Sequence, residues 1–267
     1  MKRQNKGKTL VLTGGSSGIG LKTAKLFADT GYTVYELSRS GSSKNNIIHI
    51  YTDVSDEESV NSAFYKIKNQ VDGIDLLICN AGSGISGAVE FTEYAEAKKQ
   101  FDVNFFGTTE VICKALPLLR NNRGRIICVG SVAGVISIPF QAYYSASKAA
   151  LGSFCEALRN EVAHFGIDVT CLTPGDVKTG FTGSRLKQHD GEELYEGRIN
   201  RSVTLMEKDE QAGMEPSLVA KRLFKIASYR TVRPYYTVGS GYKLLVMLAK
   251  LLPKRLVRYI VGLIYAK

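Results

Sequence analysis

Short apolar runs alternate with segments of helical periodicity along most of this 267-residue chain. Each run has the length of a strand and is followed by glycine, serine, asparagine or aspartate, residues that end strands and form turns. Such alternation favours a parallel, doubly wound sheet with right-handed crossovers and helices on both faces. We therefore predict an α/β fold of three αβα layers. The expected strands, about seven in number, span residues 8–12, 33–37, 47–51, 76–79, 125–129, 168–172 and 233–238.

Size and composition favour a single domain over residues 1–267. With 44% hydrophobic and 22% charged residues, the chain can bury a large core. No apolar run approaches the roughly 18 residues of a membrane span, and the N-terminus lacks a signal-peptide pattern, so we expect a cytoplasmic protein. The five cysteines form no Cys-x-x-Cys pair and the three histidines lie far apart, so we predict no metal site. Cys79, Cys128 and Cys171 fall within expected strands and are predicted to be reduced core residues.

The first expected strand leads into a glycine-rich turn that opens a helix. The turn reads Thr13-Gly14-Gly15-Ser16-Ser17-Gly18-Ile19-Gly20, and residues 21–30 have helical periodicity. Glycine lets the backbone approach a pyrophosphate, and the N-terminus of the helix offers free N–H groups. The spacing is Gly-x-x-x-Gly-x-Gly, which differs from the common Gly-x-Gly-x-x-Gly fingerprint. The unit nevertheless predicts a Rossmann-like dinucleotide site.

The end of the second expected strand indicates which dinucleotide binds. An acidic residue at this position holds the ribose 2′-hydroxyl of NAD, whereas an arginine accommodates the 2′-phosphate of NADP. Ser38 occupies the strand tip and Arg39 follows it, while Glu36 lies two positions earlier, inside the strand. We therefore favour NADP(H) over NAD(H). Asp53, after the third expected strand, either accepts a hydrogen bond from the adenine amino group or caps a turn.

Small and polar residues follow the later strands as well. Ligands of open parallel sheets bind beyond the carboxyl ends of the strands. The fourth expected strand leads to Asn80-Ala81-Gly82, the fifth to Gly130-Ser131, and the sixth to Thr173-Pro174-Gly175. Residues 95–119 are predicted to form a helix that contains Asn104. A lone asparagine in a helix is usually exposed to solvent, so this position alone indicates no function.

One pair of side chains predicts acid–base chemistry. Residues 142–165 have helical periodicity, and residues four apart on a helix have Cβ atoms about 5–6 Å apart, so Tyr144 and Lys148 are neighbours. A cation about 4 Å from the phenol is worth roughly 4 kcal/mol at an effective dielectric constant of about 20. This would lower the phenol pKa by up to roughly three units before desolvation opposes it. Tyr144 could then exchange a proton with a substrate oxygen near neutral pH. The residue four positions after Tyr143 is Ser147, so Tyr143 has no such cation.

Taken together, the order and spacing of these motifs resemble the short-chain dehydrogenase/reductase family over residues 8–241. The resemblance extends to its single-domain, NADP-preferring branch, which includes hydroxysteroid and retinol dehydrogenases. It implies a catalytic tetrad of Asn104, Ser131, Tyr144 and Lys148. Tyr144 and Lys148 are also implied as cofactor-binding residues, together with the glycine turn, the adenine-side motif at 80–82 and the nicotinamide-side loop after residue 173. The other cofactor contacts implied are Gly14, Ser16, Ser17, Gly18, Ile19, Gly20, Ser38, Arg39, Asp53, Val54, Asn80, Ala81, Gly82, Pro174, Gly175, Val177 and Thr179.

The resemblance implies hydride transfer between NADP(H) and a carbonyl or secondary alcohol. In reduction, Tyr144 would protonate the developing alkoxide and Ser131 would hydrogen-bond that oxygen. Lys148 would lower the phenol pKa and bind the nicotinamide ribose, and Asn104 would hold a water that connects Lys148 to solvent. Two alternatives keep the same fold. An epimerase or dehydratase uses the same tetrad but belongs to a longer branch with a substrate domain, and a non-enzymatic nucleotide-sensing protein does not need Tyr144.

The polar connection at residues 180–215 is predicted to be an irregular substrate lid, because long loops are usually functional or disordered. Phe181 would form an apolar wall of the pocket. Apolar residues after Ser131 would face the same pocket, which favours an apolar carbonyl compound or alcohol such as a steroid, retinoid, fatty or aromatic ketone. A packed loop has the same composition. The apolar residues are Val132, Val135, Ile136 and Phe140.

Residues 242–267 form an apolar, basic C-terminal segment. It carries six basic residues and no acidic one, and Pro253 is expected to divide it into two helices. Such a segment can lie on an anionic bilayer, cover the substrate pocket or pack on a second subunit. The net charge of +10 is concentrated here and in Lys2, Arg3, Lys6 and Lys8, and we find no nucleic-acid recognition motif. The family resemblance implies a homodimer or homotetramer formed through the helices at 95–119 and 143–165.

Overall fold

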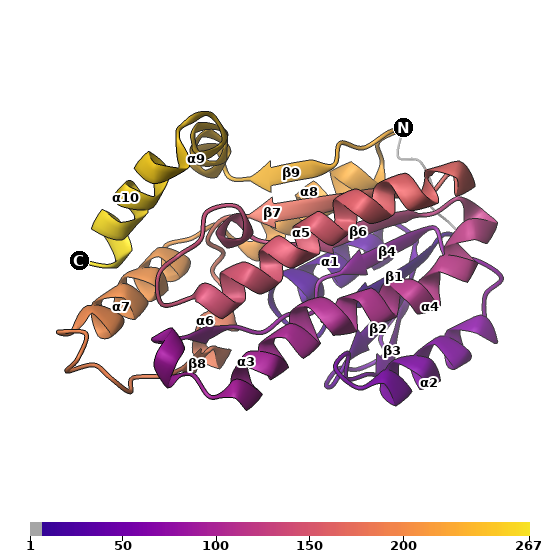
Figure 1. Ribbon diagram of the computed structural model, residues 1–267. Coiled ribbons are helices and arrows are strands. Elements are labelled where there is room, and N and C mark those ends of the chain that lie inside the picture. Colours follow the sequence, from indigo (N-terminus) through magenta and orange to yellow (C-terminus); the bar gives the residue numbers. More distant parts are fainter. Residues whose placement is uncertain (1–6) are drawn as a thin grey trace.

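A seven-stranded parallel sheet forms the centre of the molecule, with the strand order β3-β2-β1-β4-β6-β7-β9 (Figure 1). The doubly wound α/β prediction is therefore confirmed. The computed structural model describes residues 7–267, so the predicted basic residues Lys2, Arg3 and Lys6 lie outside the described residues. The strands are β1 (Thr9–Thr13), β2 (Thr33–Ser38), β3 (Ile47–Tyr51), β4 (Leu76–Cys79), β6 (Arg125–Val129), β7 (Asp168–Pro174) and β9 (Tyr235–Val238).

Helices cover both faces of this sheet, which explains why its central strands are apolar along their whole length. Helices α2, α4 and α5 pack on one face, and α1 and α8 pack on the other (Figure 1). The strand order reverses between β1 and β4, the point at which such sheets bind ligands. Cys79, Cys128 and Cys171 lie side by side on β4, β6 and β7 and are buried and free, as predicted. The helices are α1 (Gly18–Asp29), α2 (Glu57–Lys68), α4 (Gly107–Asn122), α5 (Ala142–Val162) and α8 (Pro216–Ala227).

The predicted single helix over residues 95–119 is divided in the structure. Helix α3 (Tyr94–Phe101) and helix α4 are joined by a π-helical turn at Asp102–Phe106. Such a turn inserts an extra residue into the helix and often marks a functional site. Asn104 lies in this turn and is fully buried. Asn104 therefore does not have the solvent-exposed position that is usual for a lone asparagine in a helix.

The prediction of an irregular connection over residues 180–215 is wrong. The segment contains α6 (Phe181–Ser184), β8 (Leu186–Lys187) and α7 (Arg198–Gln211). Strand β8 pairs in parallel with β5 (Ile85–Ser86), so the segment is hydrogen-bonded to the loop that follows β4. Short 3-10 helices lie at Val89–Phe91, Val132–Gly134 and Ala163–Phe165.

Helix α7 has its own apolar contacts. Ile199, Val203 and Met206 are buried together with Ala88. These three residues recur at the four- and three-residue intervals of a helix face. Their burial stabilises α7 although most of the segment at 180–215 is polar. The overall composition of that segment therefore wrongly suggests an irregular loop.

The C-terminal segment forms α9 (Ser240–Leu251) and α10 (Lys254–Tyr265), divided at Pro253 as predicted. Val246 on α9 packs on Val132 and Ile136, in the loop after β6. Helix α10 contacts α7 (Figure 1). Among residues 7–267, no helix combines the length and the apolar character needed to cross a bilayer. The outer faces of α9 and α10 expose large apolar side chains, which include Leu244, Met247, Leu251, Leu256, Tyr259 and Leu263.

Candidate active site

The turn between β1 and α1 forms a tight backbone cradle. Gly14 and Gly18 have φ angles of 67° and 50°, in the left-handed region that favours glycine. A Cβ atom at Gly20 would lie 2.0 Å from the carbonyl oxygen of Gly14, so α1 begins in direct contact with the turn. The first N–H groups of a helix have no intrahelical partner and carry partial positive charge. The turn therefore fits the pyrophosphate of a dinucleotide.

A cavity of about 1310 Å³ extends from this turn to the C-terminal helices. Small-molecule sites usually enclose about 300–1,000 Å³, so the cavity has room for a dinucleotide and a second molecule. Two predicted site residues do not line it: Gly20 packs on Gly14, and Asn104 is buried. The predicted residues that line the cavity are Gly14, Ser16, Ser17, Gly18, Ile19, Ser38, Arg39, Asp53, Val54, Asn80, Ala81, Gly82, Ser131, Tyr144, Lys148, Pro174, Gly175, Val177 and Thr179.

At the tip of β2, the acidic candidate for a ribose contact has other partners. Glu36 is 3% exposed and lies inside the strand, as predicted. Its carboxylate accepts a hydrogen bond of 2.8 Å from the Gly15 N–H and lies 2.6 Å from Nδ1 of His49. Glu36 does not line the cavity, whereas Arg39 does, with a side chain that is 71% exposed. Of Glu36 and Arg39, the arginine is therefore the one available to a ligand.

Asp53 caps a turn in the structure. Its Oδ1 accepts hydrogen bonds from the backbone N–H and the hydroxyl of Ser55, at 3.0 and 2.6 Å. Its other oxygen lies 4.0 Å from the guanidinium of Arg39. The sequence left two roles open for Asp53, and its hydrogen bonds to Ser55 are those of a turn cap.

Three of the four residues of the implied tetrad line the same part of the cavity. Ser131 follows β6, where its Oγ accepts a hydrogen bond of 3.1 Å from the Ala133 N–H. Tyr144 and Lys148 lie one turn apart on α5, with Nζ of Lys148 at 5.9 Å from the centre of the Tyr144 ring. Lys148 is 6% exposed, and its Nζ donates a 3.0 Å hydrogen bond to the carbonyl of Val129. The end of β6 thus fixes both the serine and the lysine.

Asn104 is connected to this site by hydrogen bonds to neighbouring residues. Its Oδ1 accepts from the Ser83 N–H at 2.8 Å, and its Nδ2 donates to the Ser83 carbonyl and the Ser147 hydroxyl, both at 3.1 Å. A Cβ atom at Gly82 would lie 3.3 Å from Oδ1 of Asn104 and 3.4 Å from Nζ of Lys148. The asparagine therefore ties the loop after β4 to α5 beside the lysine. The water that it was predicted to hold stays a prediction.

The prediction that Lys148 lowers the pKa of Tyr144 is wrong for this structure. Burial raises the pKa of the Tyr144 phenol above its ordinary value of 10.0, against opposing effects of the Ser131 hydroxyl and the Arg185 guanidinium. Burial also lowers the pKa of Lys148 to about 8. Desolvation is the largest influence on the phenol pKa, and Lys148 is not among the main ones. The phenol is protonated at neutral pH and can act as an acid.

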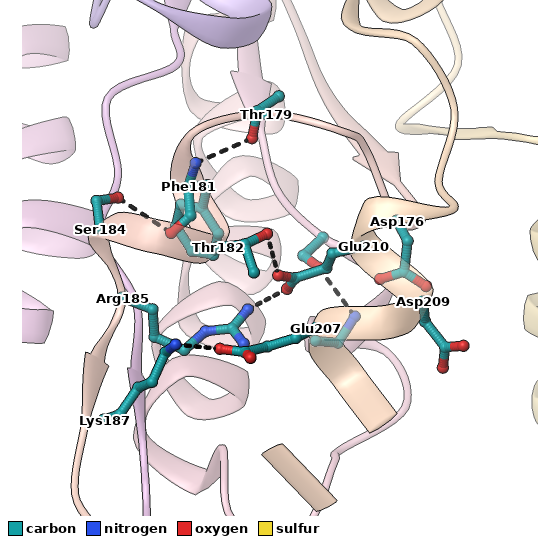
Figure 2. A network of polar contacts seen from close by, with 12 residues as sticks. Asp176, Thr179, Phe181, Thr182, Ser184, Arg185, Lys187, Glu207, Asp209 and Glu210 are labelled. Carbon is teal, nitrogen blue, oxygen red and sulfur yellow. Dashed lines mark hydrogen bonds and ion pairs between the residues drawn. The ribbon is translucent and has the colours of Figure 1, made fainter. Parts of the chain in front are cut away.

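Several residues that line the cavity were missed in the sequence. Arg185 and Glu210 form a buried ion pair beside Phe181, as Figure 2 shows. Nothing in their polar surroundings marks them as site residues. The apolar side chains of α9 and α10 had a signal, because covering the pocket was one of three roles that the segment's composition allowed. Those lining the cavity include Leu245, Leu248, Leu252, Val257, Ile260 and Ile264.

Comparisons with known proteins agree with this geometry. The family model for short chain dehydrogenases matches residues 8–190. The chain belongs to the short-chain dehydrogenase/reductase family. This short-chain dehydrogenase is 36% identical to the 3-ketodihydrosphingosine reductase of Bacteroides thetaiotaomicron, over 96% of the chain and 97% of that protein. A short-chain dehydrogenase from Streptomyces avermitilis has the same fold, with a TM-score of 0.81 at 24% identity, over 96% of this chain and 94% of that one.

Solved structures with this fold hold either nicotinamide cofactor. ElxO with NADP bound is 25% identical, with a TM-score of 0.73 over 89% of this chain and 99% of that one. The 3-ketoacyl-(acyl-carrier-protein) reductase of Brucella melitensis, complexed with NADH, is 23% identical, with a TM-score of 0.75 over 89% and 98%. The short-chain dehydrogenase thus has the nucleotide-binding fold of a family of oxidoreductases.

Proposed function

We propose that this short-chain dehydrogenase transfers a hydride between NADP(H) and an apolar carbonyl compound or secondary alcohol, with Tyr144 as general acid in reduction. The observation that carries the proposal is the placement of Tyr144, Ser131 and Lys148 on one cavity, between a glycine cradle and an apolar chamber. The relative from Bacteroides thetaiotaomicron is named as the reductase of a 3-keto compound, which supports the reductive direction.

The preference for NADP(H) rests on the tip of β2. A 2′-phosphate needs a cation there, and Arg39 is exposed and lines the cavity. The carboxylate that would favour NAD, that of Glu36, is already hydrogen-bonded to Gly15 and His49. When bound, NADPH supplies the hydride. The glycine turn would hold its pyrophosphate, residues 80–82 its adenine side, and residues 174–179 its nicotinamide side.

The proton comes from the chain itself. The raised pKa of Tyr144 keeps its phenol protonated at neutral pH, so it can donate to the oxygen of a carbonyl as negative charge develops there. Ser131 donates a second hydrogen bond to the same oxygen. Lys148 donates to the Val129 carbonyl and lines the cavity. Its remaining N–H groups would be available to the ribose hydroxyls of the cofactor.

An apolar substrate fits the chamber beyond Tyr144. The ring of Phe181 lies 5.7 Å from that of Tyr144, so Phe181 is the wall expected from the sequence. Residues 180–215 act as a structured lid over this region. Further walls come from α9 and α10, whose lining residues are aliphatic except for Tyr242 and Tyr265. An alkyl or ring substituent of a ketone can be desolvated there while its carbonyl contacts Tyr144.

The test is consumption of NADPH, followed by absorbance, with a panel of long-chain and aromatic ketones. Tyr144→Phe should reduce turnover by at least about a hundredfold while NADPH affinity changes little. Tyr143→Phe is the matched control, because Tyr143 adjoins Tyr144 but does not line the cavity. Binding of NADPH without turnover of any ketone would favour the nucleotide-sensing alternative. Conversion of a substrate without net NADPH consumption would favour an epimerase or dehydratase.

A homodimer or homotetramer formed through α4 and α5 is part of the proposal, supported by the family resemblance. Phe106, at the junction with α4, is 57% exposed. Sedimentation of the wild type and of Phe106→Glu tests it. A wild-type monomer at micromolar concentration would rule it out.

Peripheral contact of a cytoplasmic protein with anionic membranes is also proposed, through α9 and α10. Their outer faces combine exposed apolar residues with six basic and no acidic residues between 242 and 267. Co-sedimentation with anionic vesicles at low salt, lost with neutral vesicles, is the expected result. Protein that stays in the supernatant with anionic vesicles would end this part of the proposal.

A further inference from the structure

Tyr242 joins the C-terminal segment to the loop that follows β7. Strand β9 pairs with β7, so that Val238 lies beside Pro174. The chain then turns at Gly239, whose φ of 95° lies in the left-handed region, and α9 begins at the next residue. Tyr242 is in the first turn of α9 and lines the cavity together with residues 174–177. The first turn of α9 therefore lies against the end of β7.

The ring of Tyr242 packs on the backbone of Gly175. A Cβ atom at Gly175 would overlap Cγ, Cδ2 and Cε2 of that ring. Gly175 has no positive φ, so another residue could adopt its backbone conformation. The space taken by the Tyr242 ring is therefore what requires a glycine at this position, and any larger residue would displace either the ring or the loop.

The hydroxyl of Tyr242 holds the next residue of the loop. It donates a hydrogen bond to Oδ2 of Asp176. Burial and the neighbouring Asp176 raise the pKa of Tyr242, so the phenol is protonated and donates at neutral pH. Burial also raises the pKa of Asp176, Tyr242 lowers it, and the nearby charges of Glu210 and Asp209 raise it (Figure 2). Without the phenol, these like charges would repel the Asp176 carboxylate.

A second support of the same loop comes from Met214, which precedes α8. Its N–H donates to the Asp176 carbonyl at 3.0 Å, and its carbonyl accepts from the Lys178 N–H at 3.0 Å. These contacts involve the backbone of Met214 and do not depend on its side chain. Of the two supports, the one from Tyr242 is therefore the one that a side-chain substitution removes.

We infer that Tyr242 is a positioning residue for the nicotinamide-side loop, residues 174–179, through which α9 fixes the backbone against which the nicotinamide half of the cofactor binds. This rests on the proposed function, which assigns that half of NADP(H) to the loop, and it adds the C-terminal segment to the cofactor site. The proposed function assigns the adenosine half to Arg39 and residues 80–82. The affinity for that half should therefore not depend on Tyr242.

Calorimetry with NADPH and with adenosine 2′,5′-bisphosphate, which lacks the nicotinamide half, tests this difference. Tyr242→Ala should weaken binding of NADPH at least about tenfold more than binding of the bisphosphate, because only NADPH needs the ordered loop. Tyr259→Ala is the matched control. Tyr259 lies on α10, is 64% exposed and does not line the cavity, so the ratio of the two affinities should stay within about twofold of the wild type. Equal weakening of both ligands by Tyr242→Ala would overturn the inference.

A double variant distinguishes positioning from direct contact between Tyr242 and the cofactor. Gly175→Ala places a methyl group against the ring of Tyr242 and should also weaken NADPH relative to the bisphosphate. In Gly175→Ala/Tyr242→Ala the methyl group has room, so the loss should match that of Tyr242→Ala alone within about twofold. Losses that multiply would mean two independent contacts with the cofactor and would contradict a positioning role.

Hydrogen exchange of the unliganded protein separates this inference from the proposed function. Tyr242→Ala should accelerate exchange of the amides of residues 175–179 about tenfold or more, while the amides of residues 14–20 keep their wild-type rates. If Tyr242→Ala does not fold, Tyr242→Phe removes only the hydrogen bond to Asp176 and should accelerate the same amides at least about threefold.

Unchanged exchange at residues 175–179, or equal acceleration at residues 14–20, would overturn the inference, because the first shows an unaffected loop and the second a general loss of stability. If the wild type binds no NADPH but the variant shows the local acceleration, only the proposed function is refuted.

Discussion

Replacing Lys148 by methionine should change how the stability of the protein depends on pH. Burial holds the pKa of Lys148 at about 8, below its ordinary value of 10.5. Between these values the unfolded chain binds more protons than the folded one, so wild-type stability gains a contribution as pH rises. At about 1.36 kcal/mol per pKa unit, this contribution amounts to roughly 2 kcal/mol between about pH 7 and pH 9.5. Lys148→Met lacks it.

The measurement is the free energy of unfolding by urea at several pH values in that range, without cofactor, for the wild type and Lys148→Met. The wild type should gain about 2 kcal/mol on the variant as pH rises. Lys66→Met, an exposed change on α2, serves as control and should run parallel to the wild type. The tyrosines with raised pKa values, such as Tyr242 and Tyr265, are present in all three proteins and cancel. A difference that stays within about 0.5 kcal/mol across the range would refute the reasoning.

Three further predictions concern the same cavity. Gly20→Ala should weaken NADPH binding at least about tenfold in a fluorescence titration, because its Cβ would lie 2.0 Å from the Gly14 carbonyl oxygen; unchanged affinity would mean that the turn can relax. Arg39→Ala should lower the preference for NADPH over NADH, measured as the ratio of the two kcat/KM values, by about tenfold or more. An unaltered ratio would mean that the 2′-phosphate binds elsewhere. Asn104→Ala should lower the free energy of unfolding by about 1–3 kcal/mol, because the part-buried Ser83 N–H loses its acceptor and the buried Ser147 hydroxyl loses a donor. A loss of activity without this loss of stability would contradict a structural tie.

The sheet could be predicted from the sequence because its signals are local. Each strand is a short apolar run with a turn residue after it, and the first and second expected strands lie within one residue of β1 and β2. The glycine turn and the four-residue spacing of Tyr144 and Lys148 are local in the same way, since helix geometry alone makes the two side chains neighbours. For that reason the order of the motifs along the sequence was enough to predict which end of the sheet their residues share.

What could not be predicted depends on contacts between distant segments. The pKa of Lys148 is set by burial at the end of β6, and helical spacing contains no information about that desolvation. Asn104 is buried because a π-helical turn rotates it inward, which its helical sequence pattern does not specify. Arg185 directly precedes β8, which pairs with β5, and its partner Glu210 lies 25 residues further along the chain. These short strands have no distinct signal in a polar segment.

The two unlike walls of the chamber bear on how a substrate is oriented. Arg185 and, on α7, Glu210 contribute charged residues to the lining, whereas the lining residues of α9 and α10 are aliphatic except for Tyr242 and Tyr265. A ketone with one polar and one apolar substituent would bind in one orientation, because the reverse would place the apolar substituent against the carboxylates of Asp176 and Glu210. If Tyr144 and Ser131 hold the carbonyl oxygen as proposed, that orientation would present one face of the carbonyl to the nicotinamide-side loop and so determine the configuration of the alcohol formed.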